Sequence, residues 1–320
     1  MSEDEKKYKY IYGPVASRRL GRSLGVDLLP FKVCSYDCIY CQVGRTKRKS
    51  IDRIEYVPTS EVIEEIRRKV EEDVNIDIIT FAGSGEPTLH EGLKEIISSI
   101  KRFTRIPVAV LTNGSLLYLE EVRNALMDAD LVIPSLDGGS RTTFLKVNRP
   151  SPSIDFENMC EGLINFSKDF KGKVWLEVMV VKGYNDTDEE MAKIASIANR
   201  MKVEKIQLGT VVRPPAEQFV ERVSDEELLR LGRHFQAKVE VIGTGTTALQ
   251  TSSSVTEKDL EDRILALIRR RPVTLEEISI GLSLGTVEVE KAVTNLLGKK
   301  MIRVQVKEAK SYYLIENKSD

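Results

Sequence analysis

Short apolar runs alternate with longer amphipathic segments between about residue 22 and residue 212. The apolar runs are rich in Val, Ile and Leu without clean polar alternation, which is typical of parallel strands buried on both faces. The amphipathic segments carry apolar residues at helical spacing. We expect strands at residues 25–29, 76–83, 107–114, 131–137, 174–181 and 205–212. We expect helices at residues 60–72, 93–102, 119–127, 156–170 and 188–201.

This alternation predicts an α/β fold, a partial (β/α)6-type TIM barrel, over residues 1–242. Residues 243–255 are rich in Gly, Ser and Thr and are expected to form a linker that few contacts cross. In residues 256–320 the pattern predicts a small C-terminal winged-helix-like domain. Its expected helices are 260–270, 275–283 and 286–298, and its expected hairpin strands are 302–306 and 312–315.

Composition narrows the class of protein. The chain has 320 residues, of which 41% are hydrophobic and 30% charged, so it can bury a core and stay soluble. A net charge of -1 gives no general attraction to nucleic acid or acidic membranes. No apolar run approaches the roughly 20 residues that span a bilayer, and the charged start of the chain does not resemble a signal peptide. We therefore expect a cytoplasmic protein without a membrane partner.

Three of the four cysteines lie within eight positions, as Cys34, Cys38 and Cys41, directly after an expected strand. A loop with three such close thiols can bind one metal cluster and leaves one metal position open for another ligand. The alternative is a zinc site completed by a distant histidine, His90 or His234. The fourth cysteine, Cys160, lies within an expected helix among apolar neighbours and is interpreted as a core residue.

The spacing Cys-x3-Cys-x2-Cys, with Tyr40 before the last cysteine, resembles the radical S-adenosylmethionine (SAM) superfamily. This resemblance implies a [4Fe–4S] cluster on Cys34, Cys38 and Cys41, and SAM as the second cofactor. It also implies a reductant such as ferredoxin or flavodoxin and places Tyr40 against the adenine. The family reaction cleaves SAM reductively and produces a 5′-deoxyadenosyl radical that abstracts hydrogen from a substrate.

Further polar motifs end the expected strands. Gly83, Ser84, Gly85 and Glu86 resemble the Gly-Gly-Glu motif of that family, with a serine inserted, and glycine lets backbone approach a ligand closely. The resemblance also implies cofactor contacts at strand ends for Asn113, Ser135 and Asp137. Two buried polar residues interrupt apolar strands and need hydrogen-bond partners, either SAM or another side chain: Glu177 and Gln207. No residue is assigned a catalytic role.

The segment at residues 12–25 narrows the resemblance to iron–sulfur oxidoreductases grouped with the wyosine-type tRNA-modifying synthases. Those synthases carry additional cysteines for a second cluster, whereas this chain has only Cys160 besides the trio. The resemblance therefore does not imply a wyosine-forming activity for this chain.

Basic residues flank the cysteine motif and could guide an anionic substrate. Arginine suits phosphate and carboxylate groups, and the candidate substrate residues are Arg18, Arg19, Arg22 and Arg213. The equally open alternative is a charged loop whose cations pair with the chain's own acids. The substrate class predicted from sequence is an RNA base, a peptide or a small anionic metabolite.

Two other functions compete with this radical SAM oxidoreductase or transferase. One is an activating enzyme for a glycyl-radical protein, and the other is a SAM- or redox-sensing regulator with a DNA-binding winged helix. Residues 256–320 carry 12 basic and 11 acidic side chains, which disfavours duplex DNA binding. We therefore expect the C-terminal domain to dock a protein, a peptide or RNA.

Overall fold

The computed structural model describes residues 8–17, 19–72, 75–242, 257–282, 284, 286–307 and 310–316. Eight strands form one sheet in the order β1-β2-β5-β6-β7-β8-β9-β10. β1 pairs antiparallel with β2, and every later neighbour is parallel. β1 and β10 are the two edge strands and do not pair with each other within the described residues, so the sheet is an open, partial barrel.

The strand bounds follow the apolar runs of the sequence. They are β1 (Ile11–Ser17), β2 (Gly21–Val26), β5 (Ile78–Phe81), β6 (Val108–Thr112), β7 (Leu131–Pro134), β8 (Lys173–Val180), β9 (Lys205–Thr210) and β10 (Val239–Ile242). After the exposed Lys173, β8 alternates buried residues with half-buried ones. A polar side chain such as Glu177 can occupy one of the half-buried positions without interrupting the strand.

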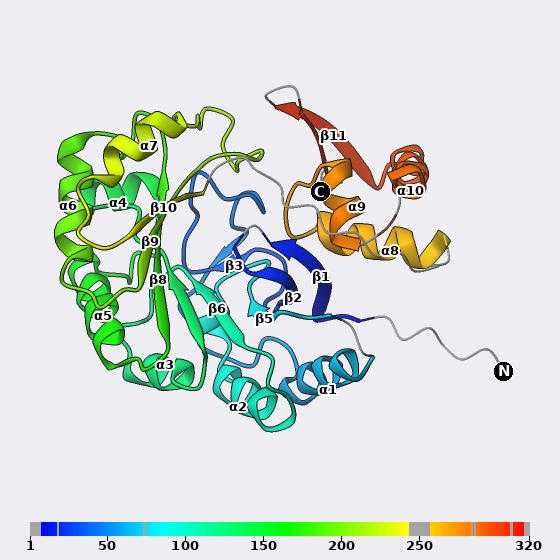
Figure 1. Cartoon of the computed structure of the whole chain (residues 1–320), viewed down its shortest axis with the longest axis horizontal. Coiled ribbons are helices and arrows are strands. Elements are labelled where there is room, and N and C mark those ends of the chain that lie inside the picture. The colour runs from blue at the N-terminus through cyan, green and yellow to red at the C-terminus, as the bar shows by residue number, and fades with distance from the viewer. Residues whose placement is uncertain are drawn as a thin grey trace.

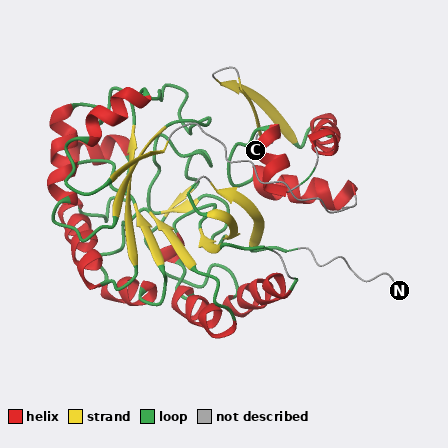
Figure 2. Cartoon of the chain, in the orientation of Figure 1, coloured by secondary structure: helices red, strands yellow, loops and turns green. Residues whose placement is uncertain are grey.

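Helices cover the outer side of the curved sheet (Figures 1 and 2). They are α1 (Thr59–Glu71), α2 (Leu93–Phe103), α3 (Glu120–Leu126), α4 (Arg141–Val147), α5 (Phe156–Asp169), α6 (Asp188–Ala198) and α7 (Asp225–Gly232). The side chains of Asp155, Thr187 and Ser224 accept a backbone hydrogen bond three residues on and so cap α5, α6 and α7. No helix in the described part of the chain is long and apolar enough to span a bilayer.

Among the strands of the eight-stranded sheet and the α-helices, four were not predicted, namely β1, β10, α4 and α7. β1 contains Gly13 and Pro14, which weaken a strand signal, and proline is tolerated there because β1 is an edge strand. The strand expected at residues 25–29 begins at Gly21 instead, because Gly21–Val26 pairs with β1 on one side and β5 on the other. For α7, the cap sequence from Ser224 to Glu227 was the available signal.

The C-terminal part consists of three helices and an antiparallel hairpin. These elements are α8 (Glu257–Ile268), α9 (Leu275–Leu282), α10 (Thr286–Gly298), β11 (Ile302–Lys307) and β12 (Lys310–Ile315). They have their own apolar core, and Tyr12 and Val15 of β1 pack against it. The hydroxyl of Tyr312 also donates to the carbonyl of Val212 (2.8 Å). The expectation of few contacts between the two parts is therefore wrong. The expected linker at residues 243–255 lies outside the described residues.

Candidate active site at the carboxyl ends of the strands

The three clustered cysteines lie on a loop whose base is closed by two short strands. β3 (Val33–Cys34) pairs in parallel with β4 (Arg48–Lys49), and the Ser50 amide donates to the carbonyl of Cys34 (3.0 Å). Within the loop the Cys41 amide donates to the Cys38 carbonyl (3.1 Å). All three thiols are reduced and half-buried. The loop therefore carries the three cysteines within one stretch of eight residues.

Each of these sulfur atoms has its own nitrogen donor. Nδ2 of Asn113 lies 3.6 Å from Sγ of Cys34, Nδ2 of Asn148 lies 3.5 Å from Sγ of Cys38, and Nζ of Lys32 lies 3.1 Å from Sγ of Cys41. Such donors stabilise a thiolate and tune an attached iron.

Burial, in contrast, favours the protonated form of the Cys34 and Cys38 thiols. It raises the pKa of Cys34 to about 12 and the pKa of Cys38 well above its ordinary value. A bound metal would overcome this, because coordination deprotonates a thiol outright. Among the described residues, no three His, Cys, Asp or Glu side chains are grouped as ligands of a single metal ion.

The glycine loop at residues 83–85 packs directly on the cysteine loop. A Cβ on Gly85 would stand 1.8 Å from the carbonyl oxygen of Val33, and one on Gly83 would stand 2.3 Å from Cγ of Asp27. The Ser84 carbonyl accepts from the Lys32 amide (3.1 Å). Gly85 is thus required by the close approach of the cysteine loop, and Gly83 by the side chain of Asp27.

Glu86 is buried behind this loop, and its carboxylate is used within the chain. It accepts from the Thr88 amide (3.1 Å) and hydroxyl (2.6 Å), the Thr112 hydroxyl (2.7 Å) and the Asn113 amide (2.7 Å). Burial raises its pKa in spite of these bonds. Glu86 therefore ties the end of β5 to the end of β6 and sets the position of Asn113, the donor to Cys34. This geometry favours a positioning role over direct contact with a cofactor.

Asp137 is the centre of a second buried network, at the end of β7. Its carboxylate accepts from the hydroxyl of Tyr40, from Nδ2 of Asn148 (2.7 Å) and from the amide of Met179 (2.9 Å). Burial raises the pKa of Asp137 to about 6. Ser135, two residues earlier, is half-buried and bridges Glu177 on β8. Tyr40 and Asp137 are thus in contact, and Ser135 precedes Asp137 by two residues; their contacts with SAM stay a prediction.

Asn148 is a site residue that the sequence did not reveal. Its amide nitrogen donates both to Cys38 and to Asp137, while its Oδ1 is buried without a hydrogen-bond partner in the described structure. An unpaired buried acceptor is costly, so this atom is suited to a donor from a ligand. Asn148 follows α4, which was not predicted, so no local signal marked it.

Arg19 is directed into the interior of the sheet. Its Nη1 donates to Glu177 (2.5 Å) and to Oε1 of Gln207 (2.9 Å). Gln207 is buried, and Glu177 is half-buried. These two polar residues therefore find a partner within the chain in Arg19, whose side chain is 17% exposed.

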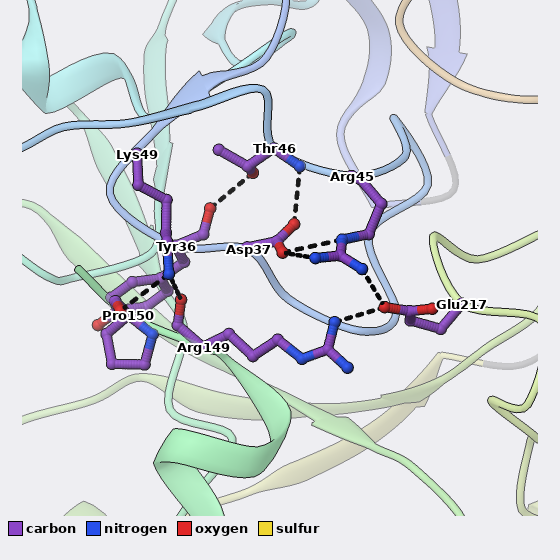
Figure 3. A network of polar contacts seen from close by, with 8 residues as sticks. All are labelled: Tyr36, Asp37, Arg45, Thr46, Lys49, Arg149, Pro150 and Glu217. Atoms are coloured by element: carbon purple, nitrogen blue, oxygen red, sulfur yellow. Dashed lines mark hydrogen bonds and ion pairs between the residues drawn. The ribbon is translucent and has the colours of Figure 1, made fainter. Parts of the chain in front are cut away.

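The remaining basic residues at this end are largely paired. Figure 3 shows Arg45 between Asp37 and Glu217, with Arg149 on the same Glu217 carboxylate. Arg213 is buried against the C-terminal part, where it donates to the Pro272 carbonyl (3.1 Å) and pairs with Glu277. Arg22 lies at the amino end of β2, the opposite end of the strands, where its backbone amide donates to Asp77 (2.7 Å). Arg18 lies outside the described residues.

The two histidines have other partners than the cysteines. His90 is buried, its Nε2 lies 2.8 Å from the Val57 carbonyl, and its Nδ1 accepts from the Gly92 amide (3.0 Å). Nε2 of His234 lies 2.7 Å from Asp188. Cys160 is buried in α5, where burial raises its pKa to about 12, as expected of a core cysteine. These partners give no support to the zinc alternative.

Residues 28–195 match the model of the radical SAM superfamily. The chain is 40% identical over 307 residues to a protein of Brachyspira hyodysenteriae named GTPase Obg, which covers 96% of this chain and 45% of that longer protein. It is 33% identical over 273 residues to a UPF0026 protein of Methanocaldococcus jannaschii, covering 83% of this chain and 84% of that protein. The fold resembles the crystal structure of a radical SAM methyltransferase from Sphaerobacter thermophilus, with a TM-score of 0.55 at 15% identity over 68% of this chain and 65% of that one. The chain therefore belongs to the radical SAM superfamily and, within it, is a member of the UPF0026 family.

Proposed function

We propose that this protein binds a [4Fe–4S] cluster through Cys34, Cys38 and Cys41 and uses it to cleave SAM reductively. The observation that carries the proposal is the loop with three half-buried thiols, each with a separate nitrogen donor, at the carboxyl ends of the strands. The radical SAM superfamily carries these two cofactors. When bound, they supply an electron and a 5′-deoxyadenosyl radical for hydrogen abstraction, so a ferredoxin- or flavodoxin-like reductant is the proposed partner.

The proposed SAM site lies between the glycine loop and the Asp137 network. Asp137 accepts from the Tyr40 hydroxyl and thereby fixes the orientation of its ring, which suits contact with a flat adenine. Asn148 offers an unpaired acceptor on the same side as Cys38. Gly83, Ser84 and Gly85 contribute backbone, and Asn113 and Ser135 line the strand ends beside them. Glu86 positions Asn113 through its backbone amide. Arg19 binds Glu177 and Gln207 and so fixes the strand beside Ser135.

For the substrate, the paired arginines give little support to an anionic ligand, because Arg19, Arg45 and Arg213 each neutralise an acid of the chain. Tyr184 instead stacks on Phe219 with ring centroids 6.2 Å apart, and Phe219 is 52% exposed. Tyr184 packs in the same apolar cluster as Tyr40. Among the substrate classes predicted from sequence, this arrangement favours one with a planar ring, such as an RNA base.

The C-terminal helices and hairpin are proposed to form a winged-helix-like docking domain and not a duplex reader. Exposed Glu288 and Glu290 lie in the first turns of α10, the helix that would enter a groove. Carboxylates there would face phosphates, which costs binding energy. This favours the enzyme over a DNA-binding regulator.

The deciding experiment is anaerobic incubation of the reconstituted protein with dithionite and SAM. Formation of 5′-deoxyadenosine and methionine supports the proposal, and its absence in a protein loaded with iron and sulfide contradicts it.

A further inference from the structure

Arg270, just after α8, is a residue of the C-terminal part that contacts two side chains beside the glycine loop, Asp27 and Tyr12. Its Nε lies 3.3 Å from Oδ2 of Asp27, and only 12% of the arginine and 7% of the aspartate side chain are exposed. Its guanidinium carbon lies 4.3 Å from the ring centroid of Tyr12. Its Nη1 donates to the Ala266 carbonyl (2.7 Å), which holds the side chain on its own helix. One arginine thus contacts two separate side chains of the sheet.

Asp27 and Tyr12 both hold the glycine loop. Asp27 accepts from the Ser84 amide (3.0 Å) through Oδ1 and from the Ser84 hydroxyl (2.7 Å) through Oδ2. The Tyr12 hydroxyl donates to the carbonyl of Ala82 (3.1 Å), the residue directly before Gly83.

The space for these contacts is provided by glycines. A Cβ on Gly25 would stand 2.0 Å from Cζ of Tyr12, so the Tyr12 ring fills the space beside that glycine. The Asp27 carboxylate fills the space beside Gly83 in the same way. The order of contacts therefore runs from Arg270 to Tyr12 and Asp27, and from them to the backbone at residues 82–84.

We propose that Arg270 is a positioning residue for the SAM site, through which the C-terminal part controls the conformation of the glycine loop. This inference rests on the proposed function only for the identity of the ligand. Without the Arg270 cation, the nearly buried Asp27 carboxylate has no counterion in this contact. A buried charge that loses its counterion reorganises its surroundings. Because Ser84 is held by that same carboxylate, the loop that packs on Val33 of the cysteine loop should lose its fixed position.

The test uses the full-length chain with Arg270→Gln, Arg270→Lys and the matched control Arg269→Gln, an exposed arginine of the same turn. In protein without cofactors, amide hydrogen exchange of residues 82–86 should be about tenfold faster in Arg270→Gln. In reconstituted protein of equal iron content, its dissociation constant for SAM should rise about tenfold, as expected for coupled neighbours. Arg270→Lys should fall between, because it keeps the charge but not the planar stack. Arg269→Gln should match the wild type.

A double variant separates positioning from general loss of stability. If Arg270 acts through Asp27, adding Arg270→Gln to Asp27→Asn should change SAM affinity little further. Unchanged exchange and unchanged SAM affinity in Arg270→Gln would overturn the inference. If Arg270→Gln does not fold, Arg270→Lys decides by the same two measurements. A wild type that binds no SAM would contradict the proposed function, while the exchange comparison would still decide the link between Arg270 and the glycine loop.

Discussion

Arg213, at the end of β9, forms a buried ion pair with Glu277 of α9. Only 5% of the arginine side chain and 16% of the glutamate side chain are exposed. Although burial opposes ionisation, Arg213 and Arg271 hold the pKa of Glu277 below its ordinary value. Because α8 and α9 also pack on β1, the C-terminal part contacts both the first edge strand and the segment after β9.

Glu277→Gln should therefore destabilise the whole chain. The substitution keeps the shape of the side chain but leaves the Arg213 guanidinium buried without a counterion, which costs about 3 kcal/mol in the free energy of unfolding. Urea unfolding of the full chain measures this loss. Glu276→Gln is the matched control, because that neighbour is exposed and should change stability by less than about 0.5 kcal/mol. An equal loss in both variants would show that the pair does not join the two parts.

Replacement of Cys34, Cys38 and Cys41 together by alanine should abolish cluster binding. The wild type, reconstituted anaerobically, should bind about four iron and four sulfide per chain and be brown. Cys160→Ala should keep the full content, since that thiol is buried in the core of α5. Iron and sulfide analysis with absorption spectra checks both variants, and a triple variant that remained brown would refute the ligand assignment.

Gly85→Ala should disrupt the cysteine loop. Its methyl group would stand 1.8 Å from the Val33 carbonyl oxygen, so either the glycine loop or the cysteine loop must move. We expect a stability loss of roughly 2 kcal/mol, in the range of overpacked cores, together with reduced iron content. The control is Gly298→Ala, where the added methyl meets nothing within 4 Å. Full iron binding by Gly85→Ala would mean that the two loops are not packed this tightly.

Asp137 should make stability decrease with rising pH. Burial raises its folded pKa from 3.8 to about 6, so between these values the folded chain binds more protons than the unfolded chain. Its contribution is complete below about pH 4 and is lost as the pH rises through 6, a change on the order of 2–3 kcal/mol. Comparing urea unfolding of the cluster-free wild type and of Asp137→Asn from pH 4 to pH 7 isolates this effect. Parallel pH profiles would show that the carboxyl group is not shifted.

The sequence by itself determined the features that depend on neighbouring residues. The cysteine trio, the glycine loop and most helices and strands are local patterns, and their periodicity reflects burial on a sheet or a helix face. For the same reason α10 was predicted with its observed bounds, Thr286–Gly298. The open parallel sheet followed from the order of these elements.

Only the tertiary structure decided which polar groups meet. Arg19 is 158 residues from Glu177 and 188 from Gln207, and Asn148 is 110 from Cys38. Spacing along the chain carries no information about such pairs, because a buried polar group needs some partner but does not specify which one. The fold likewise pairs Arg213 with Glu277 of α9, 64 residues later in the chain.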